Sequence, residues 1–269
     1  ATYHLAAIVD DHEMQISHAV RGEEWLPSAP KHFLVYRFLG WEPPIYVHTP
    51  TLRNPDKTKL SKRKGHTNVD WFINEGFLPD ALLNFLSQLG WTHPEEKEIF
   101  SREEFKQLFE LANLSPIGPV FDEAKLRWMN GKYVRELSED EFITWAKKFA
   151  DQDLSNDIWQ KLAYLIKERV EVFSQIPELI AFLNLDIEID LDLIKKQSKQ
   201  ESESIKKLLS ELKNNLNNLP IWSVLSIESV IRDLKAAYPD WKPRDYFMTI
   251  RVATTAFPVT PPLFESIEL

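Results

Sequence analysis

Cysteine is absent from all 269 residues of this sequence. The absence excludes disulfide bonds and zinc sites built on thiolates, and it is typical of proteins from a reducing compartment. The chain also lacks any apolar run near the roughly 20 residues that a membrane-spanning helix requires. Its first residues do not have the pattern of a signal peptide. Together these absences favour a cytoplasmic protein.

Glycine is confined to the first half of the chain: the last one is Gly131, and residues 132–269 contain none. Because glycine serves turns that need positive φ, its disappearance indicates a change of architecture. Before that point, residues 30–39 predict a helix that ends at Gly40. Three apolar runs predict strands, at residues 3–9, 16–20 and 45–49. This alternation is typical of an α/β fold, of which we expect only the second half here.

Helical periodicity dominates the remaining sequence. Two segments that stop at a glycine predict helices, at residues 69–75 and 80–89. Ser101 with Glu104, and Ser138 with Glu141, have the spacing of capping boxes that begin helices. Beyond Gly131, proline takes the place of glycine between segments, which favours an all-α bundle. Its two clearest apolar stripes are Trp159, Leu162, Ala163, Ile166, Val170 and Ile205, Leu208, Leu209, Leu212, Leu216, Leu219.

A cluster of cations interrupts an acidic chain. The sequence has 32 Lys plus Arg against 41 Asp plus Glu, a net charge of −9, which argues against indiscriminate binding to nucleic acid. Residues 53–64 nevertheless hold six cationic side chains and one acid, Asp56. Lysine ammoniums can follow a phosphate whose charge shifts, and a serine hydroxyl adds a donor. The cluster therefore indicates a polyphosphate site, with a solvated basic loop as the alternative.

The order of residues in this cluster resembles a known family. Residues 53–66 are similar to the KMSKS-type loop of class I aminoacyl-tRNA synthetases, in the form found in bacterial glutamyl-tRNA synthetases. The core of the loop is Lys59-Leu60-Ser61-Lys62-Arg63. Residues 3–25 resemble the late part of that family's catalytic domain, and residues 121–133 resemble the segment that leads into its helical domains. Three blocks in the right order, over about half of the chain, make the match specific.

The resemblance implies a mainly α protein with three parts. Residues 1–66 would be the second half of a class I Rossmann-like catalytic α/β domain, residues 67–135 a helical stem-contact region, and residues 136–269 an all-α anticodon-binding domain. The family's HIGH-type motif, from the first half of the nucleotide-binding fold, does not occur here. Because a buried strand at residues 3–9 would need neighbours, we expect the chain to be the C-terminal fragment of a longer synthetase, with its last helix cut short at Leu269.

The implied activity is that of a glutamate–tRNA ligase. Glutamate attacks the α-phosphate of ATP to form glutamyl-adenylate, and the glutamyl group then passes to the 3′-terminal ribose of tRNA-Glu. The resemblance implies ATP and its Mg²⁺ as cofactors, a monomeric state, and Lys59 and Lys62 as the catalytic cations on the triphosphate. Leu60, Ser61 and Arg63 would complete the ATP-binding loop, a lid over the nucleotide. In the alternative, Lys62 alone contacts the nucleotide.

Three residues outside the loop are candidates for the glutamate and adenylate pocket. Arg21 follows the apolar run at 16–20, where an α/β fold presents side chains to a ligand, and a planar guanidinium suits a carboxylate. The resemblance places Tyr3 with Arg21 at the glutamate, and Trp25 at the adenylate. The alternatives are an ion pair of Arg21 with a glutamate just after it and ordinary core packing of the aromatic residues. Ala7 stands where the family often has asparagine, so one substrate contact is expected to be lost or moved.

Asp10, Asp11 and His12 raise the question of a metal site. The seven histidines of the chain lack the spacing of a His-rich site, and no cysteine accompanies them. We therefore predict no protein-held metal, and expect Mg²⁺ to arrive with ATP. The two aspartates are expected to hydrogen-bond a turn between two strands.

Candidate RNA contacts lie in two places. Residues 125–132 interleave basic residues with the aromatic Trp128, as surfaces that follow a phosphate backbone often do. The cations there are Lys125, Arg127 and Lys132. In the family this region contacts the inner side of the tRNA; the alternative is an amphipathic helix with Trp128 in the core. Arg169 matches the arginine that the family uses for the third anticodon base, and a guanidinium can pair bidentately with a base edge.

Several other interpretations compete with a glutamate–tRNA ligase. One is a stand-alone tRNA-binding or regulatory module without catalysis, which the predicted strand at residues 3–9 disfavours. Glutaminyl relatives usually carry β-barrel anticodon domains, and a truncated paralogue that modifies tRNA would lack the helical half. We therefore predict part of a glutamate–tRNA ligase that is inactive on its own. The sequence does not decide whether tRNA-Gln is also charged.

Overall fold

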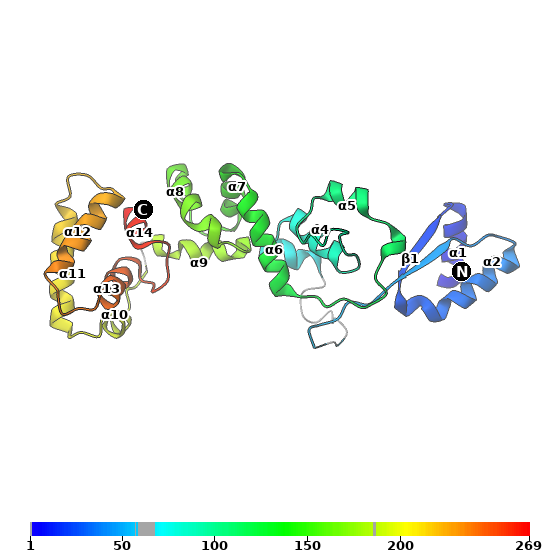
Figure 1. Ribbon diagram of the computed structural model, residues 1–269, viewed down its shortest axis with the longest axis horizontal. Coiled ribbons are helices and arrows are strands. Elements are labelled where there is room, and N and C mark those ends of the chain that lie inside the picture. The colour runs from blue at the N-terminus through cyan, green and yellow to red at the C-terminus, as the bar shows by residue number, and fades with distance from the viewer. Residues whose placement is uncertain (1, 57, 59–67, 185–186) are drawn as a thin grey trace. The chain divides into compact units, whose positions relative to one another are not determined.

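The structure is a computed structural model that describes every residue except 1, 57, 59–67 and 185–186. The described residues are mostly helical and contain one parallel pair of short strands, so the predicted mainly α fold is confirmed. They form two compact units, residues 1–133 and 134–269, which run from blue to green and from green to red in Figure 1. The three-part division predicted from the sequence stays a prediction. Among the described residues, no helix combines the length and apolar content that crossing a membrane requires.

The two strands of the first unit are parallel neighbours. β1 (His18–Gly22) pairs with β2 (Ile45–Thr49), with His18 opposite Ile45 and Arg21 opposite His48. Both strands were predicted. The second has the predicted bounds, and the first begins two residues later than predicted. The crossover that a parallel pair requires contains η1 (Glu23–Ser28) and α2 (Ala29–Leu39), and Gly40 ends α2 at φ 71°, as its position predicted. The carboxyl ends of both strands therefore lie at the same edge.

The strand predicted at residues 3–9 is wrong, because these residues begin the helix α1 (Tyr3–Glu13). Only Ile8 of this helix is fully buried, while Tyr3 and Leu5 are 52% and 41% exposed. Because these apolar side chains stay exposed, they would contribute little burial energy in an inner strand. A helix satisfies its backbone hydrogen bonds without a neighbouring strand. The helix packs on α2, and both lie beside β1 in Figure 1. The predicted turn at Asp10 and Asp11 is wrong for the same reason, since both residues lie within α1.

The rest of the first unit is helical and rich in aromatic contacts. Phe72, Phe85 and Phe121 pack within ring-centroid distances of 5.3 to 6.2 Å. The backbone N–H of Leu78 donates to the buried Asn130 side chain at 2.7 Å, which ties this core to α6. The helices are α3 (Val69–Glu75), α4 (Pro79–Gln88), α5 (Arg102–Leu108) and α6 (Glu123–Glu136), with the short turn η3 (Leu111–Asn113).

One of the two predicted capping boxes is complete. The Ser138 hydroxyl accepts from the N–H of Glu141 at 3.3 Å, and the Glu141 carboxylate accepts from the N–H of Ser138 at 2.8 Å. At α5 only the first half forms: Ser101 accepts from the N–H of Glu104 at 3.0 Å. The Glu104 carboxylate lies instead against Lys97 and His93, because an exposed lysine competes for it.

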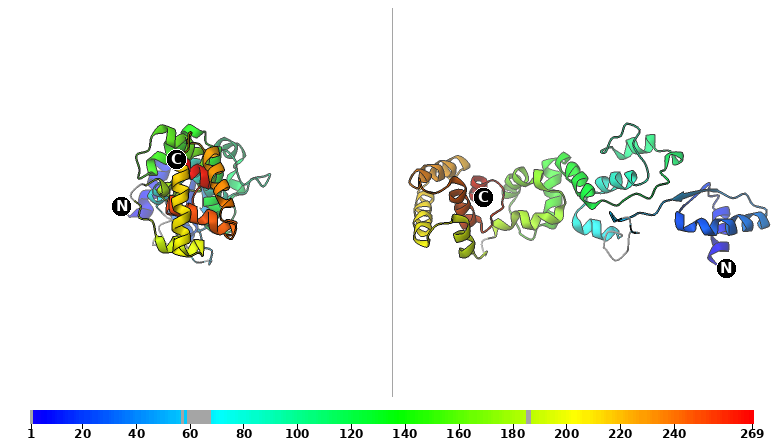
Figure 2. Two further views of the ribbon diagram at one scale, coloured as in Figure 1. Left: turned by 90° about the vertical axis from the view of Figure 1, so that its left-hand side faces the viewer. Right: turned by 60° about the horizontal axis from the view of Figure 1, so that its bottom comes forward.

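The second unit consists entirely of helices and turns in its described part, as expected. Both predicted stripes are confirmed: Trp159, Leu162 and Ile166 of α8 are buried, and so are Leu208 and Leu212 of α11. Figure 2 shows α11, in yellow, against the orange and red helices α12 and α13. The helices are α7 (Glu139–Phe149), α8 (Asn156–Ile166), α9 (Ile176–Ile180), α10 (Leu191–Ser198), α11 (Ser202–Asn217), α12 (Val224–Ala236), α13 (Pro243–Thr255) and α14 (Leu263–Glu268). The short turns are η4 (Lys167–Arg169), η5 (Phe173–Gln175) and η6 (Ala181–Leu183).

Leu208→Ala is predicted to lower the free energy of unfolding by about 2 to 5 kcal/mol, because the fully buried side chain leaves a cavity. Leu225→Ala is the matched control, since Leu225 lies on α12 and is 80% exposed; its effect should stay within about 0.5 kcal/mol. Urea unfolding followed by circular dichroism measures both. Equal losses in the two variants would contradict the assigned core.

Candidate functional site

Arg21 lies near the carboxyl end of β1 and contacts side chains from other elements. Its Nη2 lies 3.2 Å from the Asp11 carboxylate, and its Nη1 donates to the Tyr3 hydroxyl at 3.5 Å. Both charged side chains of the ion pair are largely buried, with 14% of Arg21 and 18% of Asp11 exposed. The partner is therefore Asp11, two turns into α1, and not a glutamate just after Arg21. A guanidinium held in this way is oriented before any ligand arrives.

Tyr3, Arg21 and Trp25, the three predicted pocket residues, come together in the structure. The rings of Tyr3 and Trp25 lie 5.0 Å apart, and the Arg21 guanidinium lies 6.0 Å from the centre of the Trp25 ring. They come from α1, β1 and η1, so three different elements supply the cluster. Tyr3 is 52% exposed, which argues against ordinary core packing for it. Their roles toward a substrate stay predictions.

His32 is the buried member of this cluster, with only 1% of its surface exposed. Its Nε2 lies 2.9 Å from His4 Nδ1, and its Nδ1 lies 3.5 Å from both Arg21 Nη1 and the Tyr46 hydroxyl. Burial lowers the pKa of the His32 imidazole below 6.5, and the Arg21 cation lowers it further. His32 is therefore neutral near pH 7 and acts as an uncharged neighbour of Arg21.

Asp11, His32 and Tyr46 were missed as members of this site. One signal was present: once residues 3–13 are assigned to a helix, His4 and Asp11 lie two turns apart on one face. The interpretation of residues 3–9 as a strand hid that relation. For His32 and Tyr46 the sequence carried no signal, because only the packing of α2 and β2 brings them to Arg21.

The predicted phosphate loop, with Lys59, Leu60, Ser61, Lys62 and Arg63, lies outside the described residues. Its N-terminal flank is described and anchored. Arg53 forms backbone hydrogen bonds with Pro119 and Phe121, 3.0 and 2.8 Å long, just before α6. Asn54 and Thr58 close a turn through side-chain and backbone bonds.

The cations predicted on α6 have partners of their own. Arg127 binds the carboxylates of Glu75 and Glu123 at 3.0 and 2.9 Å, and Lys125 lies 2.9 Å from Glu98. Any phosphate contact by these two residues therefore competes with an ion pair. Lys132 lies 5.8 Å from the ring centre of Trp128, which is 38% exposed and so not in the core.

Arg169 lies in the turn η4 after α8 and is exposed. Its Nη1 donates to the carbonyl of Thr260 at 3.0 Å. Arg251 of α13, which sequence reasoning missed, donates to the same carbonyl at 3.5 Å and to that of Pro261 at 2.8 Å. Burial and then the Arg169 cation lower the pKa of Arg251. Two guanidinium groups thus meet beside one loop, which suits an anionic or base-edge partner.

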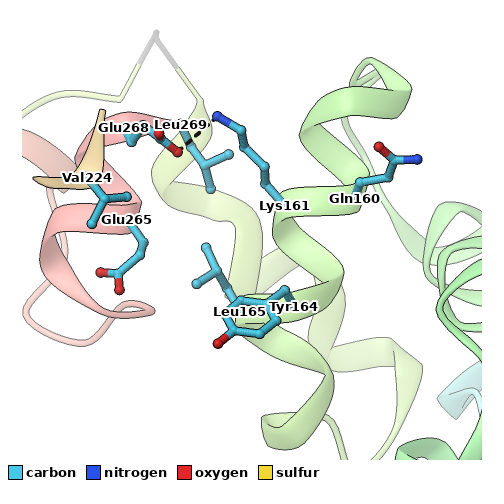
Figure 3. A pocket seen from close by; sticks show the side chains of 8 residues that line it. All are labelled: Gln160, Lys161, Tyr164, Leu165, Val224, Glu265, Glu268 and Leu269. Atoms are coloured by element: carbon cyan, nitrogen blue, oxygen red, sulfur yellow. Dashed lines mark hydrogen bonds and ion pairs between the residues drawn. The ribbon is translucent and has the colours of Figure 1, made fainter. Parts of the chain in front are cut away.

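A cavity of about 440 Å³ lies in the second unit, between α8 on one side and α12 and α14 on the other. Figure 3 shows the Lys161 side chain directed toward Glu268, with which it forms a 2.9 Å ion pair. Tyr164, Leu165 and Val224 give much of the remaining lining an apolar character. Gln160 and Glu265 add polar groups to the same lining.

No group of three or more metal-ligating side chains is placed for a metal ion anywhere in the part of the chain that the structure describes. The cluster around Arg21 offers a cation and hydrogen-bonding groups. A cation bordered by aromatic rings suits a small carboxylate.

Two families match this chain along almost its whole length. Residues 1–128 match the catalytic domain of class I tRNA synthetases for E and Q, and residues 140–269 match an anticodon-binding domain. A curated glutamate–tRNA ligase from Dehalococcoides mccartyi is 41% identical over 100% of this chain and 56% of its own length. The enzyme of that name from Thermus thermophilus is 42% identical, over 100% and 57%. The chain thus spans a little over half the length of these relatives.

A solved structure shows the same similarity. The crystal structure of a glutamate tRNA ligase from Elizabethkingia meningosepticum, in complex with its amino acid, matches with a TM-score of 0.82 and 29% sequence identity. It covers 99% of this chain and 57% of that protein. Similarity at this level extends to the fold of both units.

His32 is predicted to make stability depend on pH. Its pKa is lower in the folded chain than the 6.5 of a free imidazole, so protonation favours the unfolded state. The contribution of His32 is therefore complete above about pH 6.5 and is lost as the pH falls through the folded pKa. NMR titration of the His32 ring, with urea unfolding at each pH, measures both effects. His32→Asn should flatten this part of the profile; an unchanged profile would show that His32 does not cause it.

Proposed function

The chain belongs to the class I tRNA synthetases of the glutamate and glutamine type, and from this premise we propose that it forms part of a glutamate–tRNA ligase. The observation that carries the proposal is the convergence of Tyr3, Arg21 and Trp25 from three elements. It occurs within a sequence similar along its whole length to enzymes of that name. Glutamate, ATP and tRNA-Glu are the proposed partners. A cytoplasmic location and a monomeric state are expectations from the family.

Arg21 is proposed to bind a carboxylate of glutamate. Asp11 holds one terminal nitrogen of the guanidinium, and Tyr3 places a hydroxyl beside the other. A guanidinium can donate two parallel hydrogen bonds to a carboxylate. The Trp25 ring borders the same cation and offers a flat wall for the adenylate. Glutamine would present a neutral amide, whose own N–H groups cannot accept from Arg21.

Lys59 and Lys62 are proposed to neutralise the triphosphate, supported by Leu60, Ser61 and Arg63. Phosphoryl substitution depends on charge neutralisation more than on a protein nucleophile. ATP brings its own Mg²⁺, which would share that charge. The support for this step is the sequence order of the loop and its anchored N-terminal flank at Arg53.

RNA binding is proposed for Arg169 first, with Lys125, Arg127 and Lys132 as backbone contacts. Arg169 is exposed and uses one nitrogen on the Thr260 carbonyl, which orients the rest of its guanidinium. Arg251 beside it strengthens the local positive field. Lys125 and Arg127 contribute less, since each already has a carboxylate partner. The second unit is therefore the proposed anticodon reader.

A stand-alone RNA-binding module remains the second candidate. A strand at residues 3–9 would disfavour such a module, but the structure has a helix there. The fold does not distinguish the ligase from the RNA-binding module. Catalysis by a protein that contains this chain does.

The 269-residue chain by itself is predicted to form no glutamyl-adenylate. Its described sheet has two strands, whereas nucleotide sites of this class lie at the switch point of a larger parallel sheet. Glutamate-dependent ATP–pyrophosphate exchange measures the reaction, with a full-length relative such as the Thermus thermophilus enzyme as positive control. Robust exchange by this chain alone would refute the prediction.

Arg169→Ala is predicted to weaken binding of tRNA-Glu about tenfold, the scale of one bidentate base contact, and to reduce selectivity over an unrelated tRNA. Fluorescence anisotropy at low and high salt measures both affinities. Arg244→Ala is the matched control, because Arg244 is an exposed arginine of the same unit. Equal losses in the two variants, on both RNAs, would indicate a non-specific charge effect and contradict the assignment of Arg169.

A further inference from the structure

His32 has two ring nitrogens, and each lies against a different part of the cluster. Nδ1 lies 3.5 Å from Arg21 Nη1, and Nε2 lies 2.9 Å from His4 Nδ1. A guanidinium can only donate hydrogen bonds, so the nitrogen that meets Arg21 has to accept. The proton of a neutral His32 therefore sits on Nε2 and is donated to His4.

The Tyr46 hydroxyl is compatible with this assignment, because a hydroxyl can donate as well as accept. It lies 3.5 Å from the same Nδ1, and burial raises the pKa of Tyr46, so the hydroxyl stays protonated and can donate. Two donors thus meet one acceptor. A doubly protonated His32 would turn a third hydrogen-bond donor, and a second positive charge, toward Arg21.

We infer that His32 is a positioning residue: a neutral imidazole protonated on Nε2, whose Nδ1 holds the Arg21 guanidinium in the orientation that receives a substrate carboxylate. Asp11 holds Nη2 from α1, and His32 holds Nη1 from α2. Fixed at both terminal nitrogens, the fork is less free to rotate, which lowers the entropic cost of binding. The carboxylate role rests on the proposed function; the proton position does not.

The charge state of His32 depends on what surrounds it. Protonated His32 would be a second positive charge beside Arg21. The single negative charge of Asp11 would then face two cations. The titratable and charged groups that face it come from four elements: His4 and Asp11 of α1, Arg21 of β1, Tyr36 of α2, and Tyr46 of β2. Two of these, Tyr36 and Tyr46, have raised pKa values because of burial and stay uncharged near neutrality.

The first test uses the wild-type 269-residue chain and needs no ligand. Long-range ¹H–¹⁵N NMR of its seven histidines at about pH 7.5, a unit above the pKa of free imidazole, reports the proton on each ring. We expect the His32 ring to be neutral, with Nε2 protonated and Nδ1 bare. A charged ring, or the proton on Nδ1, would overturn the inference.

The second test compares two replacements of His32. Asparagine places an oxygen acceptor at about the position of Nδ1, whereas leucine fills similar space without one. NMR shifts of the Arg21 and Trp25 side-chain N–H signals, titrated with glutamate, report the affinity. His32→Leu should weaken it about tenfold, the effect of one hydrogen bond to a charged group, and His32→Asn should restore most of it. Equal affinity in wild type and both variants would overturn the inference.

Arg21→Lys separates this inference from the proposed function. If glutamate shifts the side-chain N–H signals of neither wild type nor this variant, the proposed carboxylate site is wrong. The proton position on His32 from the first test then still decides whether His32 contacts Arg21 as inferred. If Arg21→Lys loses the response but His32→Leu keeps it, the site is right and the role of His32 is refuted. The backbone amide spectrum of each variant checks that the first unit remains folded.

Discussion

The ion pair between Arg21 and Asp11 is the interaction on which the candidate site depends. It joins the end of β1 to the second half of α1, at 3.2 Å and largely out of water. Few other arrangements would satisfy the guanidinium, because a buried cation without a partner is costly. Tyr3, Trp25 and His32 all lie against the Arg21 guanidinium that this ion pair holds. The parallel pairing of β1 and β2 supplies the other constraint, since it places Tyr46, opposite Ala19, on the face of the strand pair that carries Arg21.

The two units carry different arrangements of charged groups. In the first, one cation is compensated by a carboxylate and bordered by aromatic rings, which suits a small anion in a defined orientation. In the second, Arg169 and Arg251 meet at the Thr260 carbonyl without a compensating acid in the hydrogen bonds that hold them. The Glu265 carboxylate acts on Arg251 and compensates the pair in part. Two guanidinium groups with one acid nearby still favour a larger anionic partner. This difference fits the proposed division between substrate binding in the first unit and RNA binding in the second.

Sequence reasoning succeeded where local rules decide the structure. Gly40 and Gly76 end helices in the left-handed conformation, and the Ser138–Glu141 box begins one. It failed at residues 3–9, where hydrophobic content alone suggested a buried strand. A short apolar run does not distinguish a strand from a helix, and the choice came from packing on α2. That single error also misplaced Asp10 and Asp11.

The sequence by itself determined the mainly helical composition, the helices of the second unit and the family, because periodicity, capping residues and ordered motifs are written in the order of residues. It also named Tyr3, Arg21 and Trp25 as a group through the resemblance. Only the tertiary structure decided that Asp11 is the partner of Arg21, that His32 and Tyr46 complete the cluster, and that Arg251 lies beside Arg169. These contacts join residues far apart in the chain, and no local pattern specifies which side chains meet when separate elements pack.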